Sequence, residues 1–543
     1  MAIPQLKRGG KQSAEGLSIP SSMQGINSVT SLALMNAAEC VYTYNLVAQD
    51  LGMVVRRGFE EWAKGWSGGI AKTVIPFEGH QTSHDKLFVS NNEGIWDCTA
   101  EGEIAPTKVL TWATQTGEAG YCSQQVFTND GNDMFILLCD AVNGYHVYTQ
   151  TTNTWAKVPL GTGAGHGEIS GIDPTNFNFV MIWKNRVWFI EKDSANSWYL
   201  DVATLYGAAT KFNFGSQFRQ GGSLRTLYNW SLDGGLGLDD LLVAVSSSGD
   251  VVVYQGTDPD DATKFAIQGS WEIGSVPAGN RFGTEFGGEV YILSIYGLLP
   301  ISQLLNGSST NDPNTYLTAK ISPFIRQVMS EFRENLGWQV VVHPEDAQLH
   351  IETPQDPQRG NVAFVQYFGN QAWSMIRELD KFHTANWRGN TFWTAGNKNS
   401  LQIKRGNRDN VWIDPGTDGV ASPIEWSILT SFQGLGSGAR NKRVQYIRPN
   451  FIADSVPGFS VSARYDYDIR EQGSAPAGSL NEAGRWDLGI WDQDVWGGSL
   501  DVLDSPRGAS GIGRHVAVAM RGRSTARTIL IAFDLIVDSG GWM

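Results

Sequence analysis

The stretch MFILLCDAVNGYHVYTQTTNTWAKV, Met134 to Val158, sets the pattern from which the fold of this chain is predicted. An apolar run of β-forming residues is followed by an Asn-Gly turn, a second run with aromatics and a longer polar connection, which together indicate a β-hairpin. Similar stretches begin at Leu87, Val180, Leu241, Glu289, Gln348 and Gly389. Their starts lie roughly 40 to 60 residues apart, the length of one four-stranded propeller blade with generous loops.

The repeated hairpins predict an all-β chain in which six or seven units close into a β-propeller. Closure is favoured because an isolated hairpin would expose apolar faces and unpaired strand edges. An elongated stack of β-sandwiches has the same turn spacing and stays open as the alternative. We expect residues 1–66 to form an N-terminal arm with lead-in strands, residues 67–405 the propeller, and residues 406–543 a C-terminal antiparallel β-sandwich.

One segment departs from the β pattern. SPFIRQVMSEFRENLG, Ser322 to Gly337, predicts a helix, with Ser322 as the cap, Pro323 at the first helical position and Gly337 at the end. Apolar residues four apart, among them Phe324 and Val328, form a stripe. We expect this inserted helix to lie against a blade or a neighbouring subunit.

Longer apolar runs with alternation follow Gly406 and predict a separate antiparallel domain. These runs begin at Arg443, Ser460, His515 and Thr528. Two glycine-rich stretches, Gly434–Arg443 and Glu471–Arg485, predict loops that are too long for tight hairpins.

Composition narrows the class of protein further. The 62 Gly, 20 Trp and 24 Phe, with 18% charged residues, indicate a turn-rich β protein. The net charge of −14 argues against gripping nucleic acid through its phosphates, but it suits a conduit past which DNA slides. With no apolar run of about 18 residues, neither a signal peptide nor a membrane span is expected.

The four cysteines show no metal-binding or disulfide spacing. They are Cys40, Cys98, Cys122 and Cys139. We therefore expect reduced, mostly buried thiols.

Near the end of the chain, RWDLGIWDQDVWGG begins at Arg485 and places Trp486, Trp491 and Trp496 five residues apart. This period fits neither a helix nor a strand, so each ring is expected to anchor a turn. The stretch is interpreted as a packing signature, and its three tryptophans are candidates for a subunit interface or a DNA channel.

Four passages, in order along the chain, resemble the β-propeller head-completion and tail-nozzle proteins of short-tailed bacteriophages, also called packaged-DNA stabilisation proteins. The passages are Ala33–Ala63, EVYILSIYGLLPIS from Glu289 with AKISPFIRQVM from Ala319, FQGLGSGARNKRVQYIRPNF from Phe432, and RWDLGIWDQDVWGG with SGIGRHVAVAMRG from Ser510. The insert Asp258–Gly274 and the long C-terminal loops depart from the family's pattern, which leaves the tip and gate regions unassigned.

The resemblance implies a non-enzymatic structural protein of the virion tail, assembled in the host cytoplasm. Copies would form a ring, expected to be a hexamer, beneath the portal and adaptor proteins, with tail fibre, spike or needle proteins attached. The ring would retain the packaged genome and later let double-stranded DNA pass through its lumen without sequence recognition. No catalytic residue, cofactor or metal ion is implied.

The main alternative to a structural virion protein is a protein that binds or cleaves carbohydrate. A sialidase-like glycoside hydrolase propeller, or a carbohydrate-binding receptor protein, would carry S-x-D-x-G-x-x-W boxes, and the hydrolase would also carry a carboxylate pair. SNNEGIW at Ser90 comes close but has Asn92 where the aspartate belongs. Because no carboxylate pair stands out, the hydrolase is the weaker hypothesis.

Other local patterns resemble metal-binding or phosphate-binding motifs only in part. His80 and His84 would ligate a metal with Asp85 if they were helical, but glycine and polar neighbours favour a surface loop. The acidic stretches Asp233–Asp240 and Asp258–Ala262 lack the EF-hand spacing, and Gly161–Gly167 lacks the order of a phosphate loop.

Basic residues gather in three places where a nozzle subunit could dock an acidic neighbour or touch DNA. The groups are Lys7, Arg8 and Lys11; Arg440, Lys442 and Arg443; and Arg521, Arg523 and Arg527. The middle group is the interface or DNA-channel candidate, and a solvated surface is its equal alternative.

Overall fold

The computed structural model describes residues 14–129, 131–162, 167–233, 238–261, 263–354, 361–377, 379, 381–395, 402–406, 413–415, 421–453, 457–474 and 501–542. The chain is all-β, as the repeats predict, with many small sheets and a few short helices. It divides into two compact units. Unit 1 comprises Met1–Gly58, Val365–Ile376 and Asp409–Met543, and unit 2 comprises Phe59–Phe364 and Arg377–Arg408.

Unit 2 begins with four antiparallel sheets, each built from four strands in up-and-down order. The strands of the first two sheets are β6 (Thr73–Phe77), β7 (Lys86–Ser90), β8 (Gly94–Asp97) and β10 (Thr107–Thr111), then β11 (Cys122–Thr128), β12 (Met134–Asp140), β13 (Gly144–Thr149) and β14 (Thr154–Lys157). Those of the next two are β16 (Phe177–Trp183), β17 (Arg186–Glu191), β18 (Asn196–Tyr199) and β20 (Thr210–Asn213), then β21 (Leu224–Asp233), β22 (Leu238–Ser246), β23 (Asp250–Gly256) and β24 (Phe265–Glu272).

Three further sheets follow in the chain. They contain β25 (Gly283–Phe286), β26 (Glu289–Ser294) and β27 (Gly297–Pro300); β28 (Gln339–His343), β29 (Gln348–Glu352) and β30 (Val362–Tyr367); and β32 (Lys381–Trp387), β33 (Asn390–Ala395) and β34 (Gln402–Gly406). The last sheet is completed by β5 (Phe59–Lys64), which pairs antiparallel with β34, and by the short β9 (Glu103–Ile104). Another small pair is β15 (Ile169–Ser170) with β19 (Gly207–Ala208).

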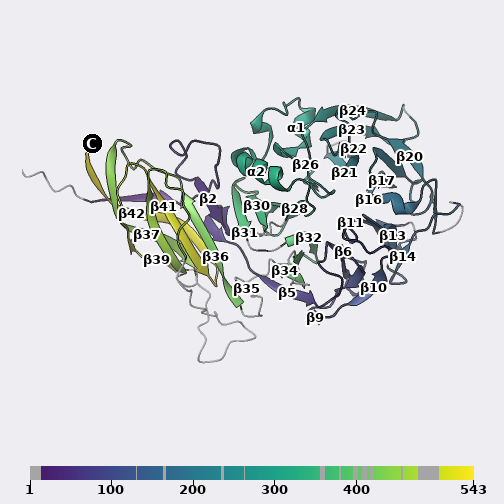
Figure 1. The fold of residues 1–543 in the computed structure, drawn as a ribbon, viewed down its shortest axis with the longest axis horizontal. Coiled ribbons are helices and arrows are strands. Elements are labelled where there is room, and N and C mark those ends of the chain that lie inside the picture. The colour runs from purple at the N-terminus through teal and green to yellow at the C-terminus, as the bar shows by residue number, and fades with distance from the viewer. Residues whose placement is uncertain are drawn as a thin grey trace, which may run out of the picture. The chain divides into compact units, whose positions relative to one another are not determined.

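The first strand of each sheet contacts the first strand of the next, in the order β6, β11, β16, β21, β25, β28 and β32, and β32 contacts β6. Figure 1 shows the colour passing from purple through blue and teal to green around this unit. Apolar cores fill the spaces between sheets: one lies between the β6 and β11 sheets, the next between the β11 and β16 sheets, and a third between the β16 and β21 sheets. A fourth packs the β5 and β32–β34 sheet on the β6 sheet, so the contacts form a closed cycle.

The stretches that begin at Leu87 and Met134 form antiparallel hairpins, and their turn residues satisfy the backbone locally. Asn91 accepts hydrogen bonds from the N–H groups of Glu93 and Gly94, and Asp140 accepts from those of Val142 and Asn143. Such side-chain acceptors favour a tight turn over a continued strand.

The helix expected from Ser322 is present, but it is shorter than predicted. Helix α2 (Ser322–Phe332) starts at Ser322 itself, with Ile321 in the cap position, and ends before Gly337. Its end is fixed by the indole of Trp338, which donates to the carbonyl of Phe332 at 3.0 Å. Ile325 and Met329 are buried, as an amphipathic helix requires. Other helices are α1 (Ile301–Leu305) and the 3-10 turns Thr82–His84, Pro174–Asn176, Pro313–Thr315 and Ala319–Ile321.

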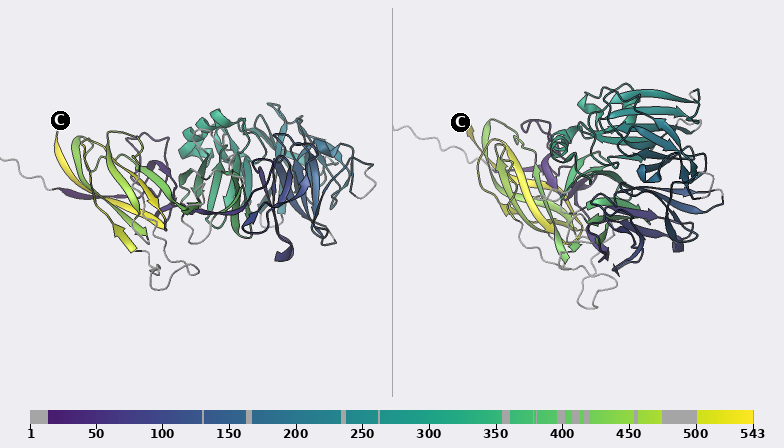
Figure 2. Two further views of the ribbon diagram at one scale, coloured as in Figure 1. Left: turned by 60° about the horizontal axis from the view of Figure 1, so that its bottom comes forward. Right: turned by 45° about the vertical axis from the view of Figure 1, so that its right-hand side comes forward.

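Unit 1 contains strands of two sheets, contributed by both ends of the chain and by the segment Val365–Ile376. One has the order β3-β4-β42-β37-β39, with β1 on β42 and β40 on β37, and the other contains β38, β41, β36, β2 and β31, with β35 on β36. The strands are β1 (Glu15–Pro20), β2 (Cys40–Tyr44), β3 (Leu46–Gln49), β4 (Gly52–Val55), β31 (Trp373–Arg377), β35 (Ile413–Pro415), β36 (Ala421–Thr430), β37 (Arg440–Ala453), β38 (Gly458–Tyr465), β39 (Asp501–Asp504), β40 (Arg507–Gly508), β41 (Val516–Ser524) and β42 (Thr528–Trp542). Figure 2 shows the purple N-terminal strands among the yellow-green C-terminal ones.

Aromatic rings join the two sheets of unit 1. The Phe451 ring of β37 lies 6.3 Å from that of Trp426 on β36 and 5.6 Å from that of Phe459 on β38. Because these rings come from both sheets and are buried, the sheets share one apolar interior. All four C-terminal runs predicted as strands lie in these sheets.

Candidate functional site

A cavity of about 300 Å³ lies where the first strands of the seven sheets of unit 2 meet. Every sheet contributes to its lining, which includes Thr73, Cys122, Phe179, Leu227, Glu285, Val340 and His383. We call it the central cavity. Its volume is at the low end of small-molecule sites, so its polar groups decide what it can do.

Arg281 crosses the central cavity and joins three sheets. Its guanidinium donates to the carbonyl of Lys72 at 3.0 Å, to the Thr73 hydroxyl at 2.7 Å and to the carbonyl of Cys122 at 2.9 Å. The carbon of that guanidinium lies 4.0 Å from the ring centroid of Tyr121. Burial lowers the pKa of Arg281, yet the group stays charged at neutral pH.

The Thr73 hydroxyl makes three hydrogen bonds in this cavity. It donates to the carbonyl of Gly120 at 2.8 Å and accepts from the backbone N–H of Cys122 at 3.0 Å, in addition to the bond from Arg281. The neighbouring Cys122 thiol is buried, and burial raises its pKa well above the ordinary value. A protonated thiol is a poor nucleophile, so this cysteine serves packing.

His383 and Glu285 face the same cavity from other sheets. His383 Nδ1 accepts the backbone N–H of Val74 at 3.0 Å, which ties β32 to β6. Burial, with a contribution from Arg281, holds the pKa of His383 well below its ordinary value, so the ring is neutral. Glu285 accepts the N–H of Asn229 at 2.7 Å, and burial raises the pKa of this carboxyl.

Glu285 is the single carboxylate among the described residues that line the central cavity. Glycoside hydrolysis of the usual kind needs two carboxyl groups that flank the scissile bond. The polar side chains Arg281, Thr73 and His383 are instead engaged in bonds that join one sheet to another. The arrangement is therefore suited to holding the sheets together.

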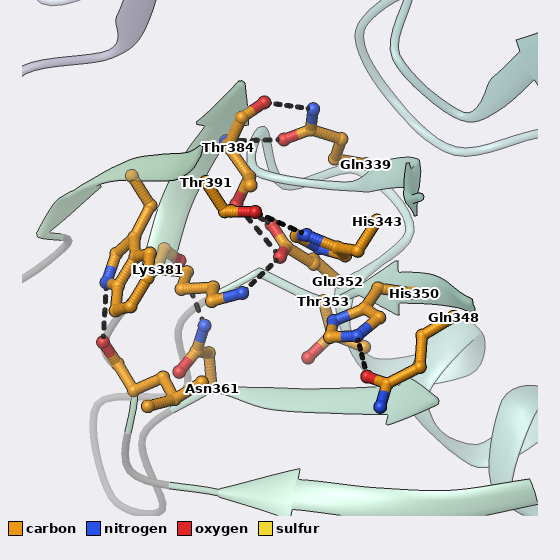
Figure 3. A network of polar contacts seen from close by, with 12 residues as sticks. Gln339, His343, Gln348, His350, Glu352, Thr353, Asn361, Lys381, Thr384 and Thr391 are labelled. Carbon is orange, nitrogen blue, oxygen red and sulfur yellow. Dashed lines mark hydrogen bonds and ion pairs between the residues drawn. The ribbon is translucent and has the colours of Figure 1, made fainter. Parts of the chain in front are cut away.

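A second polar cluster lies between the β28–β29 hairpin and the β32–β33 hairpin (Figure 3). Its members, His343, His350, Glu352, Lys381, Thr384 and Thr391, are all buried, and we call it the His343 cluster. Lys381 Nζ lies 3.0 Å from Glu352 Oε1, and the Thr384 hydroxyl lies 2.9 and 2.8 Å from the two oxygens of that carboxylate. Gln339 fastens the two hairpins through both ends of its amide, which bond to the backbone of Thr384.

Two imidazoles complete the His343 cluster. The rings of His343 and His350 have centroids 4.0 Å apart. Burial lowers the pKa of both rings well below the ordinary value, and the charge of Lys381 lowers them further, so both are neutral. One ligand atom each from His343, His350 and Glu352 lies within 4.8 Å of the other two.

The histidines that the sequence singled out do not converge on a metal site. His80 and His84 are exposed; the first bonds to the carbonyl of Asn132 and the second to the amide of Gln150. The Asp85 carboxylate accepts from the N–H of Gly79 at 2.9 Å and pairs with Arg388 at 2.7 Å. This agrees with the loop interpretation of the segment.

The basic residues expected in a loop lie at the start of β37. Lys442 is buried, and its ammonium donates to the carbonyls of Ser437, Arg440 and Arg514. Burial also lowers the pKa of Lys442. Arg443 is exposed, so within this group Arg443 presents a charge to solvent while Lys442 holds the chain turn together.

The Arg521 and Arg523 side chains lie on β41 and bind the carboxylate of Glu425 on β36, the former at 2.7 Å. Their charge is therefore partly compensated, whereas Arg527 is exposed. Trp486, Trp491, Trp496 and the group Lys7, Arg8 and Lys11 lie outside the described residues.

The sequence interpretation did not single out His343, His350 or Glu352. A signal was present: Gln339 and His343 stand four residues apart, on the same face of a strand, and Gln348, His350 and Glu352 alternate with apolar residues. In strands, alternate positions share a face, so the two runs predict a polar face on an otherwise apolar hairpin. What the pattern leaves out is the facing hairpin that buries this face.

No family model matches the chain, and no curated protein matches it. Solved structures similar to it include the extracellular domain assigned to a hybrid two-component system of B. thetaiotaomicron, with 11% identity, a TM-score of 0.36 and coverage of 73% of this chain and 51% of that one. Another is Chaetomium thermophilum Raptor, with 10% identity, a TM-score of 0.36 and coverage of 65% of this chain and 29% of that one. The chain thus spans about half the length of the first and less than a third of the second.

No helix among the described residues is long and apolar enough to cross a membrane.

Proposed function

We propose that unit 2 is a seven-bladed β-propeller and unit 1 a β-sandwich, and that the chain is a structural ring subunit. The closed cycle of sheet contacts supports the propeller. So does the pairing of β5 with β34, because it joins the first strand of the unit to its last sheet. The shared apolar interior of the two sheets supports the sandwich.

The function proposed is that of a tail nozzle or head-to-tail closure protein, which retains packaged DNA and forms the channel for its ejection. This proposal is based on the resemblance of four passages, in the same order along the chain, to the tail-nozzle proteins of short-tailed bacteriophages. The observation that supports the proposed path of the DNA is the small size of the central cavity. Its volume is about 300 Å³, and Arg281 in its lining bonds to Thr73 of another sheet. A duplex whose major groove alone is about 12 Å wide does not fit there, so the channel would run between copies of the chain.

In this proposal the chain is not an enzyme. Copies form a ring, with six as the expected number, at the virion tail below the portal and adaptor proteins, and fibre, spike or needle proteins attach further on. The net charge of −14 supports a passage through which DNA moves without being held. Loops would serve as gates, since moving a loop breaks few buried contacts.

One surface offers a contact for the neighbouring copy. Tyr446 on β37 and Ile536 on β42 stand opposite each other and are 50% and 43% exposed. An apolar pair in the middle of two long strands would gain stability from being covered.

Negative-stain microscopy of the purified chain, alone and mixed with portal-adaptor complexes, tests this proposal. The expected result is a six-fold ring that binds the complexes and no glycan. Tyr446→Ser with Ile536→Ser should dissociate the ring, whereas Val126→Ser, at an exposed position in unit 2, should leave it intact. A monomer or trimer that binds or cleaves polysaccharide would overturn the proposal in favour of the carbohydrate-recognising alternative.

A further inference from the structure

The His343 cluster contains two buried ring nitrogens to which no group donates a hydrogen bond. His343 Nε2 and His350 Nδ1 are buried and have no hydrogen-bond partner in the structure. A buried nitrogen without a partner costs free energy, so a native pair of them calls for an occupant.

Hydrogen bonding on the far side of each ring determines where the lone pairs lie. The Thr391 hydroxyl donates its one hydrogen to Asn386 Oδ1, at 3.2 Å. The bond of 3.0 Å between His343 Nδ1 and this hydroxyl must therefore be donated by the ring. That tautomer leaves the lone pair of His343 on Nε2.

His350 follows the same logic. Its Nε2 lies 2.9 Å from Gln348 Oε1, which can only accept. Nε2 therefore carries the hydrogen, and the lone pair lies on Nδ1. Both unpartnered nitrogens are thus acceptors, and the Glu352 carboxylate beside them is an acceptor as well.

We propose that His343 Nε2, His350 Nδ1 and a carboxylate oxygen of Glu352 bind one divalent transition-metal ion, with Zn²⁺ as the best match. Two neutral imidazoles and one carboxylate form a donor set that zinc takes in proteins, with a fourth position for water. Thr391 and Gln348 hold the far nitrogens of the rings, as outer partners of ligating histidines do. The proposal adds a metal ion that the sequence did not predict, and it is independent of the ring assembly proposed above.

Ligand spacing is compatible with this assignment. Bonds of about 2.1 Å in a tetrahedron place ligand atoms about 3.4 Å apart. One ligand atom of each of the three residues lies within 4.8 Å of the other two, so a small rotation of the side chains brings the donor atoms to the ion. Because the cluster is buried, the ion stabilises the contact between the β28–β29 and β32–β33 hairpins and takes no part in a reaction with solvent.

Removing the positive charge of Lys381 tests the proposed metal site, because its loss is expected to strengthen metal binding. The ammonium of Lys381 lies 3.0 Å from Glu352 Oε1, so its positive charge opposes a metal cation bound to the same carboxylate. Lys381→Met should therefore tighten Zn²⁺ binding. The same variant leaves Glu352 without its counter-charge, so its melting temperature should rise on Zn²⁺ addition by more than that of the unchanged chain.

The first experiment measures metal content. The full chain, stripped by a chelator, reloaded with Zn²⁺ and desalted, should retain about one Zn²⁺ per chain. His343→Ala and His350→Ala should retain none, and the control His146→Ala, another buried histidine, should retain the ion. Thr391→Val should weaken Zn²⁺ binding about 10- to 100-fold as a positioning residue.

A measurement on the unchanged chain guards against variants that fail to fold. Co²⁺ bound in place of Zn²⁺ should give the strong visible absorption of a tetrahedral site. A folded chain that retains no Zn²⁺ and gives no such band, or a Lys381→Met variant whose Zn²⁺ affinity is unchanged or weaker, would overturn the proposal. A water molecule donating to both nitrogens would then be the occupant.

Discussion

Glu352 and Lys381 form an ion pair inside unit 2, with Oε1 and Nζ 3.0 Å apart and side chains that are 1% and 3% exposed. Thr384 donates to the same carboxylate, and the Lys381 ammonium lies 4.8 Å from the ring centroid of Trp393. Each charge therefore has its compensation within the fold, and removing either one leaves the other buried and unpaired.

We expect Lys381→Ala to lower the free energy of unfolding by about 3 to 5 kcal/mol, and Lys381→Met with Glu352→Leu to recover most of this loss. Urea unfolding of chelator-treated protein measures both. The exposed pair Lys64 and Glu61 serves as the control, and Lys64→Met should cost less than about 1 kcal/mol. A double variant as unstable as the single one would contradict the burial argument.

Arg281→Met should destabilise the chain by about 3 kcal/mol, because the carbonyls of Lys72 and Cys122 then lose their charged donor inside unit 2. Denaturant midpoints give the measurement. Arg333→Met, which removes a more exposed arginine paired with Glu334, should change the midpoint little. Equal effects of the two substitutions would mean that water replaces Arg281 as the hydrogen-bond donor to the carbonyls of Lys72 and Cys122.

Gly120 and Gly102 offer a matched pair. Both have positive φ, 91° and 74°, but a Cβ at Gly120 would lie 2.5 Å from the carbonyl oxygen of Asn91, whereas at Gly102 it would meet nothing within 4 Å. Gly102→Ala should cost about 1 to 2 kcal/mol for the left-handed backbone alone. Gly120→Ala should cost clearly more, and calorimetry showing similar losses would argue against the close contact.

His146 predicts a loss of stability in acid. Burial lowers its pKa to about 4, against the ordinary value of about 6.5, and Asp140 and Lys157 act on the ring with opposite signs. Between pH 6.5 and pH 4 this histidine is protonated in the unfolded chain and neutral in the folded chain. The contribution of His146 to stability therefore falls from pH 6.5 toward pH 4 and is constant above pH 6.5. At pH 5 this histidine should account for about 2 kcal/mol.

Urea unfolding at pH 7 and pH 5 measures this effect. His146→Gln should reduce the decline by about 2 kcal/mol and leave the part that the other buried histidines cause, whereas His80→Gln, at an exposed site, should leave it unchanged. An identical decline in all three proteins would show that His146 does not contribute to the loss of stability in acid.

The four cysteines should resist thiol reagents in the native protein. All four are buried thiols that form no disulfide, and burial raises the pKa of the Cys122 and Cys139 thiols. Labelling should therefore follow the rate of unfolding. Fast modification of one cysteine under native conditions would contradict its burial.

The hairpins were predictable because their information is local. Asn143 and Gly144 mark a turn between two apolar runs, and β12 and β13 form on either side of it. The length of α2 was not predictable from the sequence. Its end depends on Trp338, whose indole bonds to the carbonyl of Phe332 only after the chain has turned back on the helix.

Pairings between distant residues lie beyond such patterns. Nothing near Phe59 in the sequence indicates that β5 pairs with β34, and nothing around His350 indicates that Thr391 lies across from His343. Lys442 shows the same limit: its position in a basic, glycine-rich stretch predicts an exposed cation, yet three carbonyls enclose it.

The pairing of β5 with β34 also governs when the protein can be finished during synthesis. Ribosomes add about 5 to 20 residues per second, so β5 emerges roughly 17 to 70 s before its partner strand exists. Throughout that interval the edge of β5 is open to wrong partners, and the N-terminal strands of unit 1 wait longer still for β42. Unit 2 can therefore close only after β34 has emerged, and the sheets of unit 1 only after β42, so both units pass through a state with open strand edges during synthesis.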